Sequence, residues 1–185
     1  PFEIWGDGEQ VRDWIHVGDH AEALWMALNQ HGLDISPEQE IELEGLPTSV
    51  KLDRLGVPAE LREAINTEKQ RQTLYLIHKL AKPLPNIVDT LVRLKLEGKR
   101  IGISSNAVRA TVYAAMRKTG IVKYIDLVLS NEEARKPKPD PDIYLMALSC
   151  MHIPASEAVV VEDHPKGVAA AKAAGIRVVQ VNDQS

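Results

Sequence analysis

Ser105 and Asn106 could bind a phosphate group through a hydroxyl group and exposed backbone N–H groups. They stand where the apolar segment 100–105 (RIGISS) ends. A turn from a strand into a helix is suited to holding a phosphate oxygen in this way. Serine and asparagine at such a turn also cap helices through local hydrogen bonds. The two residues are therefore candidates for phosphate binding, and capping is the structural alternative.

A segment rich in lysine and proline follows the next apolar segment, 125–130. Residues 136–142 read KPKPDPD. The prolines fix backbone φ angles, which holds the side chain of Lys136 in an extended loop. A lysine in this position can neutralise a phosphate or an aspartyl-phosphate. The alternative is a solvated basic turn, and we expect Asp140 and Asp142 to cap a helix.

Glu162 and Asp163 end a third apolar segment, 158–162 (AVVVE), which we expect to be a strand buried on both faces. Carboxylates at the end of such a strand are costly unless they are solvated or bound to a cation. Their oxygen ligands suit Mg²⁺, which takes one or two protein carboxylates and retains waters. The alternative is that Asp163 caps the following helix.

The elements around these residues alternate between strands and helices. We expect strands at 100–105, 125–130, 158–162 and 177–181, with helices at 86–97, 108–120, 140–151 and 167–174. This order predicts an α/β fold with a Rossmann-like parallel sheet. In such sheets the chemistry lies beyond the carboxyl ends of the strands. The three polar segments therefore supply a hydroxyl, a cation and carboxylates at one edge.

The earlier part of the chain has helical character. Residues 20–29 and 58–82 have apolar residues at helical spacing, and Ser36-Pro37-Glu38 has the composition of a helix start. We expect a small all-helical cap domain at 20–82 and an α/β core at 83–185. Residues 1–19 form a separate N-terminal segment, and all three tryptophans lie within the first 25 residues.

Composition excludes several classes of protein. The net charge is −4 over 185 residues, whereas a nucleic-acid-binding protein usually has a basic surplus. No apolar run is long enough for a membrane helix, and the first residues do not resemble a signal peptide. Cys150 is the only cysteine, so no internal disulfide can form. We expect a cytoplasmic protein that binds neither nucleic acid nor membrane.

The motifs GISSNA, KPKPDPDIYLMAL and VVVEDHPKGVAAAKAAGI resemble three motifs of the haloacid dehalogenase superfamily, and the resemblance covers residues 20–185. The chain looks most like the β-phosphoglucomutase-like branch, whose helical cap follows the first strand. The resemblance implies a Mg²⁺-dependent phosphatase or phosphomutase acting on a small phosphorylated sugar. It implies that Ser105 and Asn106 bind the phosphoryl group, that Lys136 stabilises its charge, and that Glu162 and Asp163 bind the metal.

The segment 44–51 resembles the loop of the cap that faces the substrate in this branch. It contains Glu44-Gly45-Leu46-Pro47-Thr48 and, shortly after, Lys51. The resemblance implies that Gly45, Thr48 and Lys51 contact the substrate.

The superfamily's first motif, an Asp-x-Asp pair that supplies nucleophile and acid, is missing before His20. Asp19 and Asp7 are the candidates for a replacement nucleophile. We expect Val11–Val17 (VRDWIHV) to replace the usual first strand between the strands that end at Ser105 and Glu162. Loss of the nucleophile would impair turnover. There are two alternatives to an enzyme. One is a non-catalytic module that binds phosphate or a phosphosugar, and the other is an unproductive fusion product.

Residues 1–28 have a resemblance of their own, to NAD-dependent sugar-nucleotide epimerases and dehydratases. The similarity lies in PFEIWGDGEQVRDWIHVGDHAEALWMAL. The glycine-rich NAD loop and the Tyr-x-x-x-Lys site of that family are absent. We therefore expect a fragment that binds no NAD.

Overall fold

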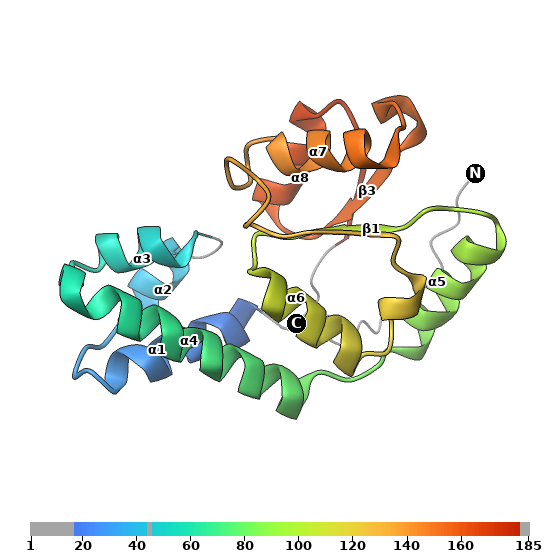
Figure 1. The fold of residues 1–185 in the computed structure, drawn as a ribbon. Helices are drawn as coiled ribbons and strands as arrows, with labels where there is room; N and C mark the ends of the chain where they lie inside the picture. Colours follow the sequence, from blue (N-terminus) through green and yellow to red (C-terminus); the bar gives the residue numbers. More distant parts are fainter. Residues whose placement is uncertain (1–16, 44–45, 182–185) are drawn as a thin grey trace. The chain divides into compact units, whose positions relative to one another are not determined.

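The computed structural model describes residues 17–43 and 46–181 (Figure 1). These residues belong to two compact units, which meet in the sequence between Lys82 and Pro83. Residues 1–16, which are most of the N-terminal segment expected at 1–19, lie outside the described residues, together with Asp7 and most of the expected strand Val11–Val17. Val17 itself is the first residue of a helix.

The unit before Pro83 is helical throughout its described part. It contains α1 (Val17–Asn29), α2 (Pro37–Leu43), α3 (Thr48–Arg54) and α4 (Ala59–Leu80). The long helix α4 packs chiefly against α1. The buried core of this unit consists of aliphatic side chains from these helices and the turn after α3: Leu24, Ala27, Leu28, Leu52, Val57 and Ile65. The expected helices at 20–29 and 58–82 correspond to α1 and α4.

The start of α2 follows from a reciprocal pair of hydrogen bonds. The Ser36 hydroxyl accepts a hydrogen bond from the Gln39 backbone N–H at 3.3 Å, and the Ser36 N–H donates to Gln39 Oε1 at 2.9 Å. This capping box satisfies two backbone donors, and Pro37 fits the first helical position because it has no N–H. The helix start expected at Ser36-Pro37 is confirmed.

The second unit alternates helices with short strands, as an α/β Rossmann-like fold does. Its main elements are α5 (Pro85–Leu96), β1 (Gly102–Ser104), α6 (Arg109–Lys118), β2 (Leu127–Leu129), α7 (Asp142–Met151), β3 (Val159–Glu162), α8 (Pro165–Ala173) and β4 (Arg177–Gln180). Two 3₁₀ turns, Val122–Tyr124 and Ala155–Glu157, precede β2 and β3. The N-cap of α5 is Leu84, so this helix begins one residue before the start expected at 86. Pro85 takes the first helical position.

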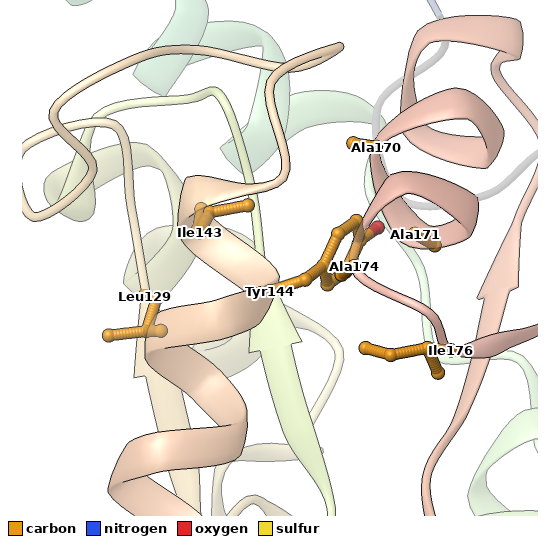
Figure 2. Packing of buried hydrophobic residues seen from close by; sticks show 7 residues of the cluster. All are labelled: Leu129, Ile143, Tyr144, Ala170, Ala171, Ala174 and Ile176. Atoms are coloured by element: carbon orange, nitrogen blue, oxygen red, sulfur yellow. The ribbon is translucent and has the colours of Figure 1, made fainter. Parts of the chain in front are cut away.

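The described strands form two parallel pairs. β1 pairs with β2, with Ile103 opposite Val128, and β3 pairs with β4, with Val160 opposite Val178. Within residues 17–43 and 46–181, no strand joins β1 to β3. The two pairs share one core that includes Leu129, Ile143, Tyr144, Ala170, Ala171, Ala174 and Ile176. Figure 2 shows Tyr144 extending from α7 toward the alanines of α8, whose small side chains leave room for its ring.

Strand β3 is less buried than its composition suggests. Val160 packs against the shared core, whereas Val159 and Val161 are 43% and 64% exposed. Successive side chains of a strand point to opposite faces. The described residues thus cover one face of β3, and the expectation of burial on both faces is wrong. None of the described helices has the length and apolar character required to cross a membrane.

Candidate functional site

Ser105 lies directly after β1 and is anchored to the neighbouring strand. Its backbone N–H donates to the carbonyl of Leu129 in β2 at 2.9 Å, and its hydroxyl oxygen accepts from the Ala107 N–H at 3.1 Å. This bond closes a local turn before α6, but the N-cap of α6 is Val108, which has no side-chain capping bond, so the helix-capping role considered for Ser105 is wrong. Because the hydroxyl oxygen is the acceptor of that bond, its own proton is available for a further acceptor such as a phosphate oxygen.

Asn106 connects this turn to the loop after β2. Its Oδ1 accepts a hydrogen bond from the Lys138 backbone N–H at 3.1 Å. The Lys138 side chain is only 9% exposed, and its Nζ donates to the Tyr144 hydroxyl at 2.8 Å. The same Nζ forms an ion pair with Glu162 Oε1 and lies 4.7 Å from the centre of the Tyr144 ring. A cation is thus held beneath the surface beside the turn that carries Ser105.

Glu162 completes this arrangement from the end of β3. Its side chain is 12% exposed, and Oε1 accepts from the Tyr144 hydroxyl at 2.7 Å. Burial, followed by the charge of Glu162, raises the pKa of the Tyr144 phenol, which remains a donor. The Glu162 carboxylate packs against Gly167 so closely that a Cβ there would overlap it. We call Asn106, Lys138, Tyr144 and Glu162 the Lys138 cluster.

Lys136 occupies a different environment. Its side chain is 73% exposed and forms an ion pair with Asp140 at 3.6 Å. The structure therefore brings Lys138, not Lys136, to the end of β3. The sequence contains two Lys-Pro pairs two residues apart, and composition does not distinguish them. The path of the loop decides which lysine turns inward.

Asp163 is exposed beside the cluster. Its Oδ1 accepts from the His164 N–H at 2.6 Å, but the N-cap of α8 is His164, whose Nδ1 accepts from the Lys166 N–H. The capping role considered for Asp163 is therefore wrong. Glu162 and Asp163 offer two adjacent carboxylates, a donor set that suits Mg²⁺. Across the part of the chain that is described, no group of three or more such metal-binding side chains occurs.

The remaining candidate residues lie in the helical unit or outside the residues that the structure describes. Thr48 and Lys51 lie in α3 of the helical unit, and Gly45 is not among the described residues. Asp19 lies near the start of α1, where its backbone is helical. The structure thus brings together Asn106, next to Ser105, and Glu162, next to Asp163, and it adds Lys138 and Tyr144, which the sequence reasoning missed.

Three comparisons extend these observations. The family model described as haloacid dehalogenase-like hydrolase matches residues 19–181. The β-phosphoglucomutase of Bacillus subtilis is 32% identical over 171 residues, covering 91% of this chain and 74% of that protein. The phosphorylated carbohydrates phosphatase of Thermotoga maritima is 28% identical over 138 residues. This match covers 73% of this chain and 61% of the phosphatase, less than two thirds of its length.

Solved structures show the same fold. The crystal structure of CbbY from Rhodobacter sphaeroides in complex with phosphate is similar with a TM-score of 0.78 and 24% identity. The similarity covers 91% of this chain and 82% of CbbY. At this identity the likeness establishes the fold alone.

Proposed function

The chain belongs to the haloacid dehalogenase-like hydrolases, and from this premise we propose that it is a Mg²⁺-dependent phosphatase or phosphomutase scaffold for a small phosphorylated sugar. We further propose that its turnover is impaired, because the segment before His20 has no Asp-x-Asp pair. We also propose that the protein is located in the cytoplasm. The mutase of Bacillus subtilis and the phosphatase of Thermotoga maritima support the class of substrate.

One observation carries the proposal. Ser105 follows β1 and Asp163 follows β3, and the buried Lys138 in the loop after β2 joins these two strand ends by contacting Asn106 and Glu162. Phosphoryl transfer depends mainly on positioning and charge neutralisation, which these groups can provide. Ser105 would hydrogen-bond a phosphate oxygen, and Lys138, in place of Lys136, would neutralise its charge.

Glu162 and Asp163 are the residues that would hold Mg²⁺. When bound, the ion would supply positive charge to the phosphate oxygens. The chain's own contribution is to keep both carboxylates at the end of β3. Gly167 leaves room for one of them, and because His164 caps α8, the Asp163 side chain is not needed there.

A non-catalytic phosphate-binding module is the second candidate. The helical backbone at Asp19 favours it, because a nucleophile of this kind is expected beyond the end of a strand. Such a module needs Ser105, Lys138 and the carboxylates but no nucleophile.

Hydrolysis of p-nitrophenyl phosphate and binding of inorganic phosphate, each with and without Mg²⁺, distinguish these candidates. Turnover that is lost in Asp163→Asn supports the enzyme, and loss in Asp19→Asn as well identifies Asp19 as the nucleophile. Phosphate and Mg²⁺ binding without turnover supports the binding module. If the folded chain shows no turnover and binds neither phosphate nor Mg²⁺, both candidates are wrong.

A further inference from the structure

The amine of Lys138 already has an anionic partner within the protein. Its Nζ contacts Glu162 Oε1 directly, and both side chains are nearly buried, at 9% and 12% exposure. The Tyr144 hydroxyl joins the two, accepting from Lys138 and donating to the same Glu162 oxygen. Three groups thus form a closed triangle of hydrogen bonds around one carboxylate oxygen.

In this triangle the positive charge of Lys138 is already paired with Glu162, whereas a bound phosphate would need that charge for itself. Ion pairs shielded from water are stronger than exposed ones, so the Lys138 charge is neutralised efficiently in this arrangement. A phosphate dianion that approached Lys138 would also meet the negative charge of Glu162. Glu162 therefore opposes phosphate binding in two ways, by pairing with the lysine and by repelling the ligand.

We propose that Glu162 acts as an internal competitor of phosphate for Lys138, and that a divalent cation relieves this competition by taking the carboxylate. The inference rests on the proposed function, because it concerns the same site. A cation at Glu162 and Asp163 shifts the carboxylate charge away from Lys138, which leaves the lysine to the phosphate. Linkage then requires that each ligand strengthens binding of the other by the same factor.

The contacts of Glu162 confine the competition to the Lys138 cluster. Gly167 limits the carboxylate on one side, and Tyr144 fixes it on another. Asp163 is exposed, and no described ion pair joins it to Lys138. Removing the Glu162 charge should therefore release Lys138, whereas removing a distant surface charge should not.

Isothermal titration of inorganic phosphate at neutral pH, with EDTA present, tests the proposal. We expect Glu162→Gln to bind phosphate about tenfold more tightly than the unaltered chain, a typical size for coupling between two ligands. Glu157→Gln, which removes the same charge from an exposed residue before β3, should bind like the unaltered chain. In a second titration, with Mg²⁺ in place of EDTA, phosphate binding should become stronger in the unaltered chain. The strengthening should be much smaller in Glu162→Gln.

Glu162→Asp provides a second variant that keeps the charge. Its shorter side chain cannot reach Lys138 as Glu162 does, so phosphate affinity should rise again, by less than in Glu162→Gln. Thermal unfolding of each variant without phosphate checks that the titrated protein is folded. The same measurement with phosphate should show a larger rise in Tm for the variants than for the unaltered chain.

The outcomes separate this inference from the proposed function. If the unaltered chain binds phosphate and both Glu162 variants bind it equally or more weakly, the competition does not exist and the proposed function stands. If neither the chain nor its variants bind phosphate, the proposed function is wrong and the inference falls with it.

Discussion

Two ion pairs at the carboxyl ends of the strands differ in burial and in what surrounds them. Arg109 at the start of α6 pairs with Glu133 after β2 at 2.5 Å, with side chains 42% and 24% exposed. Lys138 pairs with Glu162 at 9% and 12% exposure. Both pairs join a lysine or arginine to a glutamate across the fold, but water reaches only the first freely.

The partners of each glutamate explain the difference in role. Glu133 Oε2 accepts from the Ser130 N–H at 2.6 Å and from the Ser130 hydroxyl at 2.7 Å, which fixes the loop directly after β2. Glu162 instead shares one oxygen between a lysine and a tyrosine. A buried charge pair is an expensive way to stabilise a fold, since apolar residues would often do it equally well. The exposed pair therefore holds a loop, whereas the buried pair lies in the candidate site.

Lys138→Met should have the largest effect on stability. Methionine keeps the apolar part of the side chain, but the Glu162 carboxylate is then buried without its cationic partner. We therefore expect the free energy of unfolding to fall by about 3 kcal/mol. Urea denaturation measures this change. Lys118→Met in α6, an exposed lysine, is the matched control.

The double variant Lys138→Met with Glu162→Gln sharpens this test. It removes both charges, so it should recover a substantial part of the lost stability. A Lys138→Met variant as stable as Lys118→Met would mean that the two ion pairs are energetically alike, and the comparison would lose its basis.

Gly167→Ala should have the next largest effect. Alanine normally stabilises a helix relative to glycine, but here its Cβ would overlap the Glu162 carboxylate. We expect a net loss of about 2 kcal/mol in the free energy of unfolding, measured by urea denaturation. In a Glu162→Ala background the obstruction is gone, and the same substitution should become neutral or stabilising. Destabilisation in both backgrounds would show that Gly167 matters for another reason.

Most of the fold could be predicted because its signals are local. The capping box at Ser36 and the alternation of apolar segments with helices placed the elements to within a few residues. The division into two strand pairs and the exposure of Val161 could not be predicted in this way. They depend on which strands become neighbours, which involves residues far apart in the sequence.

In the candidate site, the residues at the strand ends could be proposed from the sequence, whereas the buried lysine of the loop could not. Ser105 and Glu162 follow from the rule that chemistry lies beyond the carboxyl ends of parallel strands. Lys138 depends on the course of the loop between β2 and α7, for which two equivalent Lys-Pro pairs give no signal. One error had an available signal, because Pro165 at the first helical position places the cap at His164 rather than Asp163.

Glu133→Gln should have a smaller effect, and one that depends on pH. Arg109 first, then the Ser130 N–H and hydroxyl, lower the pKa of Glu133 from 4.5 to about 2. The carboxylate thus contributes stability that is fully present above pH 4.5 and is lost as the pH falls toward 2. At neutral pH we expect the variant to lower the Tm by about 2–4 °C, since water screens this pair.

Thermal unfolding as a function of pH measures this contribution. The difference in Tm between the unaltered chain and Glu133→Gln should shrink as the pH falls below 4.5, because the unaltered chain loses its charged acceptor there. Glu157→Gln should show no comparable difference. A constant Tm difference down to low pH would mean that packing, rather than charge, gives Glu133 its role.

Lys136→Ala should have the smallest effect, and it separates the two lysines of the loop. Lys136 is 73% exposed and pairs with Asp140, so its loss should leave stability almost unchanged. Phosphate affinity, measured by isothermal titration, should change less than about twofold, because an exposed charge is screened by salt. Loss of phosphate binding in Lys136→Ala would instead place the phosphate at the exposed lysine. In that case the buried pair of Lys138 and Glu162 would serve the fold alone, and its burial would have to be explained by the connection it makes between the two strand pairs.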